Sequence, residues 1–128
     1  MSPNAPGAAP AEGGAVIYKI VPEAIWREAA EAGRCAGAGV DLTDGYVHFS
    51  TAAQVRDTAA KHFAGQTGLL LVAVDVHALA GVLRWEPSRG GDLFPHLYQD
   101  LPMSAVQWAV PLPVGLDGRH AFPASLGS

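Results

Sequence analysis

One short apolar run in the middle of the chain constrains the fold more than any other feature. Residues Leu69 to Val74 are all aliphatic, and the run ends at Asp75. A strand that is covered on both faces has this almost continuous apolar pattern, whereas a strand with one wet face alternates. We therefore expect the central strand of a sheet here. The run is far shorter than the roughly 18 apolar residues of a membrane-crossing helix, and the sequence predicts no membrane span.

Further strands and helices are predicted around this run. Residues 15–21 are rich in β-branched side chains and predict a strand, after which Pro22 suits the first position of a helix. Thr51, with Gln54 three residues later, forms a capping-box pattern that predicts a second helix ending at Gly65. Strands and helices mixed without regular alternation favour an α+β domain with two main helices. Additional strands are predicted at 82–86, 94–98 and 103–110.

The chain has room for one domain. Residues 1–14 are rich in Ala, Gly and Pro and lack the features of a secretory signal, so we expect a flexible extension. The domain is expected to span 15–113, and an irregular tail rich in Pro and Gly to occupy 114–128. The single cysteine, Cys35, cannot form an internal disulfide, which fits a reducing compartment, and we expect a cytoplasmic protein.

Composition and motifs exclude several classes of function. The net charge is −4 and the eight basic residues are scattered, so no stripe could follow the backbone of duplex nucleic acid. No CxxC or HExxH spacing is present, and we predict no metal site. GxSxG, Walker and GxGxxG motifs are also absent from the sequence. The common nucleophile and nucleotide motifs therefore give no guide to activity.

Polar side chains gather on one predicted strand before the second helix. In residues 46–50 the period of two places Tyr46, His48 and Ser50 on one face and the two apolar residues on the core face. Ser50 and Thr51 precede the start of a helix, where free backbone N–H groups favour anions. His48 is either a ligand contact or a core histidine satisfied by a backbone carbonyl.

A second group of candidates lies near the predicted Gly-rich loop. His96 and Tyr98 share one side of an extended segment beside Gly90 and Gly91, where a ligand could approach the backbone. Arg89 suits bidentate binding of a phosphate or carboxylate, although exposed loop arginines are commonly only solvated. Lys19, in the middle of the first strand, lies either on a solvated face or in a site.

Several blocks of sequence together form a recognisable pattern: Ile17-Tyr18-Lys19-Ile20, Asp44-Gly45-Tyr46-Val47-His48-Phe49-Ser50-Thr51, Arg84-Trp85-Glu86, Ser88-Arg89-Gly90-Gly91 and Phe94-Pro95-His96-Leu97-Tyr98. In this order they resemble the DUF952 family of small bacterial and plant proteins of unknown function. The resemblance covers Val16 to Leu112, and it implies a fold similar to that of the ADP-ribosyltransferase superfamily. In that fold a split, mostly antiparallel sheet binds NAD in a central cleft.

The resemblance also implies roles for individual residues. In the superfamily an early His or Arg holds the nucleotide ribose, aromatic rings enclose the nicotinamide, and a late glutamate often polarises the ribose. Lys19 stands near the early position, and His48, with Ser50 and Thr51, lies on the second motif-like strand. Tyr98 is the candidate for an aromatic wall.

The late glutamate has no counterpart in this sequence, where Gln107 is the nearest polar residue on the predicted last strand. A related branch, the RNA 2'-phosphotransferases, works with Arg and His side chains instead. Arg89, His48 and His96 are residues of those types, able to grip a phosphate and to transfer a proton.

The leading hypothesis is a pocket for NAD, ADP-ribose or a related phosphate-bearing nucleotide, with a transferase activity. His48 and His96 are its candidate catalytic residues. Its candidate ligand-binding residues are Lys19, Ser50, Thr51, Arg89 and Tyr98. One alternative is a non-enzymatic accessory or interaction domain in which the His and Tyr side chains form a buried hydrogen-bond network. A second alternative is a hydrolase with a histidine general base.

Overall fold

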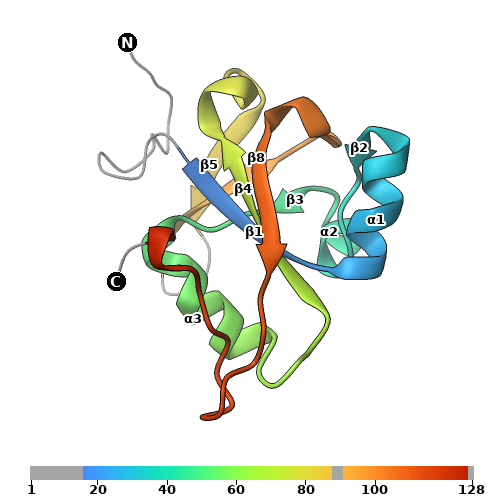
Figure 1. Cartoon of the computed structure of the whole chain (residues 1–128). Helices are drawn as coiled ribbons and strands as arrows, with labels where there is room; N and C mark the ends of the chain where they lie inside the picture. Colours follow the sequence, from blue (N-terminus) through green and yellow to red (C-terminus); the bar gives the residue numbers. More distant parts are fainter. Residues whose placement is uncertain (1–15, 88–90, 127–128) are drawn as a thin grey trace.

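The computed structural model describes residues 16–87 and 91–126, and within them the chain is α+β with antiparallel pairing between its strands (Figure 1). The helices are α1 (Glu23–Ala32), α2 (Val40–Asp44) and α3 (Ala52–His62), and 3-10 turns occupy Val76–Leu79, Met103–Ala105 and Ala124–Leu126. The strands are β1 (Val16–Pro22), β2 (Arg34–Cys35), β3 (Val47–His48), β4 (Leu69–Asp75), β5 (Leu83–Pro87), β6 (Leu93–Leu97), β7 (Leu101–Pro102) and β8 (Val106–Pro111).

The strand formed by the apolar run lies at the centre of a sheet, as predicted. β4 pairs with β1 on one side and with β8 on the other. Val72 and Val74 pack into one apolar core, whereas Leu71 and Ala73 pack into a second core on the opposite face. Because each face of β4 covers its own core, the continuous apolar sequence is explained.

A second three-stranded sheet, in the order β3-β6-β5, supports the candidate histidines. Tyr18 of β1 and Ser50, just after β3, exchange two backbone hydrogen bonds of 2.7 and 2.8 Å, which join this sheet to the central one. Val47 and Phe49 are buried, as the alternation predicted. The end of this segment is therefore held beside β1.

The helix boundaries agree in part with the predicted ones. Thr51 and Gln54 form the predicted capping box at the start of α3. The predicted first helical residue Pro22 instead ends β1 with ψ 140°, and α1 begins at Glu23. α3 ends at His62, before the predicted stop at Gly65, because the C-cap Phe63 leaves helical geometry.

The segment after β8 returns along α3 (Figure 1). Leu112 and Leu126 are buried in the second core, and His120 Nε2 donates to the carbonyl oxygen of Gln66 at 2.8 Å. None of the helices within the described ranges is long and apolar enough to span a membrane.

Candidate functional site

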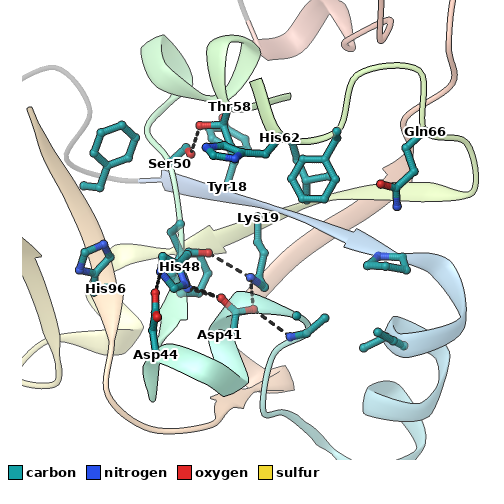
Figure 2. Close-up of a pocket in the computed structure, with 18 residues that line it drawn as sticks. Tyr18, Lys19, Asp41, Asp44, His48, Ser50, Thr58, His62, Gln66 and His96 are labelled. Carbon is teal, nitrogen blue, oxygen red and sulfur yellow. Dashed lines mark hydrogen bonds and ion pairs between the residues drawn. The ribbon is translucent and has the colours of Figure 1, made fainter. Parts of the chain in front are cut away.

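A cavity of about 600 Å³ opens between β1, the start of α1, α2, β3, α3 and β6 (Figure 2). Four predicted site residues line it together: Lys19, His48, Ser50 and His96. They come from strands that are far apart in the sequence and meet through the pairing of β3 with β6 and the Tyr18–Ser50 bridge. The remaining lining residues are Tyr18, Ile20, Pro22, Ile25, Ala38, Gly39, Asp41, Asp44, Phe49, Thr58, His62, Phe63, Gln66 and Phe94.

Asp41 organises the polar wall of this cavity. Its Oδ2 accepts from Lys19 Nζ at 2.6 Å and from the Ala38 N–H at 2.9 Å. Its Oδ1 lies 2.7 Å from His48 Nδ1 and 2.9 Å from the His48 backbone N–H. Burial alone would raise the pKa of Asp41, but the hydrogen bond from His48 and the charge of Lys19 lower it from 3.8 to about 2. The carboxylate is therefore a buried anion whose two oxygens face four donors from the protein.

The backbone around α2 places this carboxylate. Gly45 has a positive φ of 87° and caps the C-terminus of α2. At the other end of the segment, Gly37 has φ 99° and passes directly against Asp41. A Cβ at Gly37 would lie 2.4 Å from the Cβ of Asp41.

Replacing Gly37 by alanine is therefore expected to displace Asp41 from Lys19 and His48. Beyond the backbone strain, about 1–2 kcal/mol for a non-glycine residue in this region, the clash should cost further stability. Gly39→Ala is the matched control, because its φ is also positive at 54° but nothing lies within 4 Å of the added Cβ. Urea unfolding of both variants tests this: equal losses of stability would show that the contact with Asp41 does not matter.

His48 lies between two carboxylates. Nδ1 faces the buried Asp41, and Nε2 lies 3.1 Å from Oδ2 of the exposed Asp44 (Figure 2). Each ring nitrogen of His48 therefore faces a carboxylate oxygen to which it can donate. Asp41 fixes the orientation of the ring from the buried side, while Nε2 faces Asp44 at the cavity.

His96 is held by a third carboxylate. It is the register partner of His48 across β3 and β6, and the two ring centroids are 5.3 Å apart. His96 Nδ1 donates to Glu86 Oε1 at 2.8 Å, and the same oxygen accepts from the Tyr98 hydroxyl at 2.7 Å. These two hydrogen bonds lower the pKa of Glu86, while the bond to Glu86 is the main cause that raises the pKa of Tyr98 to about 12.

Burial lowers the pKa of His96, which is only 3% exposed, and the bond to Glu86 offsets this in part. A neutral ring that donates through Nδ1 keeps a lone pair on Nε2. No hydrogen-bond partner for that nitrogen lies among residues 16–87 and 91–126. His96 therefore brings an unused acceptor to the wall of the cavity.

The lowered pKa of His96 predicts a dependence of stability on pH. Below its ordinary value of 6.5 the unfolded chain binds more protons at this residue than the folded one, so stability should fall as pH decreases from about 7 to about 5. His96→Asn, which keeps a donor near the position of Nδ1 but cannot titrate, should lose less stability over the same range. Identical urea midpoint changes in the two proteins would contradict this.

Tyr46 joins the two histidines from the outside. Its ring centroid lies 4.5 Å from that of His48, 4.4 Å from that of His96 and 4.9 Å from that of Tyr98. Such close, tilted aromatic contacts stabilise one another and restrict rotation. Tyr46 therefore packs against both imidazoles and restricts their rotation.

Ser50 faces the cavity with a directed hydroxyl. Ser50 Oγ lies 3.0 Å from Thr58 Oγ1, and either hydroxyl can be the donor in this hydrogen bond. A hydroxyl has one donor and two acceptor positions, so Ser50 keeps hydrogen-bonding capacity for a ligand.

The other predicted binding residues do not line this cavity within the described part of the chain. The hydroxyl of Thr51 is used by the backbone N–H of Gln54 in the capping box. Tyr98 is 47% exposed, with its hydroxyl on Glu86. Arg89 lies outside the described residues. No three His, Cys, Asp or Glu side chains of the described ranges are grouped so that they could hold a metal ion.

None of the three carboxylates is among the predicted site residues. For Asp41 a signal was present: Lys19 stands among the apolar residues of β1, and a buried lysine requires a carboxylate partner. Glu86 was detectable from strand pairing, because His96 opposes Arg84 and so lies diagonal to Glu86 on the same face of the sheet.

The fold and the cavity define a small α+β domain with two carboxylate-held histidines in a pocket. The chain matches the model of a family described as "Protein of unknown function (DUF952)" over residues 20–109. It therefore belongs to the DUF952 family, as the sequence motifs predicted.

Two solved structures of protein CC0527 from Caulobacter crescentus are similar to this chain. The X-ray crystal structure is 43% identical, with a TM-score of 0.83, and the match covers 88% of this chain and 99% of that one. The solution NMR structure is 46% identical, with a TM-score of 0.73, and covers 81% and 90% respectively. A comparison with curated proteins found no match.

Proposed function

We propose that this domain binds NAD, ADP-ribose or a related phosphate-bearing nucleotide in the cavity, on a fold of ADP-ribosyltransferase type, and transfers a group from it. One observation carries the proposal: two imidazoles, each oriented by a carboxylate, oppose each other across β3 and β6 at the wall of one pocket. Carboxylate-oriented imidazoles are a recurring arrangement for proton transfer.

The size and lining of the cavity suit such a ligand. Its volume of about 600 Å³ falls within the range of about 300–1,000 Å³ that is typical of small-molecule sites. Ile20, Ile25 and Phe63 supply apolar surface for a flat base. Lys19 and Ser50 supply polar atoms for ribose and phosphate oxygens.

The two histidines are suited to different tasks. His96 is neutral, with Nε2 as an acceptor, and can take the proton of an attacking hydroxyl or water. His48 donates through Nε2 and can bind a ribose or phosphate oxygen once Asp44 yields that position. In the transfer, nicotinamide leaves with the electrons of its bond to C1' of the ribose, the acceptor oxygen bonds to C1', and its proton passes to His96.

A second candidate function is a non-enzymatic interaction domain in which the same side chains serve only stability. The observation that favours it is the fully satisfied network of Asp41, whose four donors all come from the protein itself. It predicts that no nucleotide stabilises the fold.

A thermal-shift screen separates the two. We expect NAD, NADP, ADP-ribose, nicotinamide or a 2'-phosphorylated nucleotide to stabilise the protein, by about 2.7 kcal/mol at 100 times its Kd, which raises Tm by several degrees. The shift should be lost in His48→Asn. The absence of a shift with all five would overturn the nucleotide proposal and favour the interaction domain.

A further inference from the structure

A second cavity, of about 500 Å³, lies on another side of α3, where the chain returns after β8. We propose that it is a binding site for a small phosphate ester with an apolar body. The cavity is separate from the histidine pocket, with no lining residue in common. Its lining consists of Arg56, Ala59, Ala60, Ala64, Gly118, Arg119, His120 and Phe122.

The two sides of the cavity differ in chemistry. Ala59 and Ala60 of α3, with Ala64 just after the helix, form a floor whose small side chains leave the space open. The guanidinium of Arg56 lies 5.3 Å from the ring centroid of Phe122, a cation–π distance that holds both groups in place. A floor of methyl groups and an aromatic ring suits the apolar body of a ligand.

The opposite wall is a loop that carries Arg119 and is held by its own hydrogen bonds. Gly115 N–H donates to the Arg119 carbonyl at 2.7 Å, and Asp117 Oδ1 accepts from the Arg119 N–H at 3.0 Å. His120 is fixed by its bond to Gln66. The loop is thus ordered by its own hydrogen bonds before any ligand arrives, so little entropy is lost on binding.

The charges of the cavity are positive. Two of the chain's six arginines line it, although the whole chain carries a net charge of −4. No Asp or Glu is among the lining residues, and within the described ranges the Arg119 guanidinium forms no ion pair. The nearby acids have other contacts: Asp117 accepts from the loop backbone, and Asp57 pairs with Lys61 at 3.4 Å.

This combination selects the class of ligand. A phosphate monoester carries a charge of about −1.5 to −2 at neutral pH and three acceptor oxygens. The Arg119 guanidinium can donate two parallel hydrogen bonds to these oxygens, and with the positive charge of Arg56 in the same cavity it suits such a dianion better than a single carboxylate. The alanines and Phe122 then favour an ester over inorganic phosphate.

Calorimetric titration with phenyl phosphate and with inorganic phosphate tests the proposal. We expect saturable binding of phenyl phosphate, weaker binding of inorganic phosphate, and a loss of about tenfold or more in affinity in Arg119→Ala. Arg119 is exposed and its guanidinium forms no ion pair within the described ranges, so this variant should fold normally. The matched control is Arg27→Ala, which removes an exposed arginine on α1.

A second pair of variants separates this site from the histidine pocket. His48→Asn should leave the affinity for phenyl phosphate unchanged. No saturable binding, or equal affinity in wild type and Arg119→Ala, would overturn the proposal. If His48→Asn rather than Arg119→Ala weakened binding, the phosphate would occupy the histidine pocket, which would overturn the second site while supporting the proposed function.

Discussion

Replacing Asp41 by alanine should lower the free energy of unfolding by about 3–5 kcal/mol, because it leaves the buried ammonium of Lys19 without its counter-charge. The same change removes the acceptor of the Ala38 N–H and of two His48 donors. Urea denaturation at neutral pH measures the loss. Few single substitutions in the chain should cost more.

Asp44→Ala is the matched control, since Asp44 also pairs with His48 but is exposed. Its loss should be below about 1 kcal/mol. The double variant Lys19→Met/Asp41→Asn should be more stable than Asp41→Ala, because no buried charge remains unpaired. Equal losses for Asp41→Ala and Asp44→Ala would contradict the role of Asp41.

The lowered pKa of Asp41 also predicts how the stability difference between wild type and Asp41→Ala depends on pH. Its folded value, about 2, lies below its ordinary value of 3.8, so the folded state binds fewer protons in this range. The stability from ionised Asp41 is present above about pH 4 and is lost as pH falls through about 2. The difference between wild type and Asp41→Ala should shrink over that interval.

Removing the outward nitrogen of either pocket histidine should weaken nucleotide binding about 10- to 100-fold, the equivalent of a hydrogen bond to a charged group. Asparagine is the substitution of choice, because its amide nitrogen lies near the position of Nδ1 and keeps a donor for Asp41 or Glu86. His48→Asn and His96→Asn therefore remove Nε2 with the least disturbance of the fold. Calorimetry with the nucleotide that gives the largest thermal shift measures the effect.

His77→Asn provides the control for this pair of variants. His77 is exposed in the turn after β4 and does not line the cavity. Its replacement should leave Kd unchanged. Unchanged affinity in both pocket variants would show that the histidines do not contact the ligand.

Sequence patterns correctly predicted those elements whose formation depends on residues that are close together in the chain. The run from Leu69 to Val74 predicted a doubly covered strand, and β4 is one. The alternation in residues 46–50 correctly placed Val47 and Phe49 in the core, and Thr51 with Gln54 correctly predicted the start of α3. In each case the signal is a periodicity or a cap within a few residues.

The acidic half of the pocket was not predicted, because it depends on contacts between distant segments. Asp41 reaches Lys19 across 22 residues and has no motif of its own. Glu86 meets His96 only once the register of β5 on β6 is known. Sequence patterns identified His48 and His96 as candidate site residues. Only the tertiary structure determines which carboxylate orients each imidazole.

The most direct test of the nucleotide pocket is an NMR titration of the ¹⁵N-labelled protein with the nucleotide that stabilises it most. We expect saturable changes at the amides of Lys19, His48, Ser50 and His96, with Arg27 on α1 unaffected. Changes confined to α3 and residues 118–122, or no saturable change with any nucleotide, would contradict the assignment of this pocket.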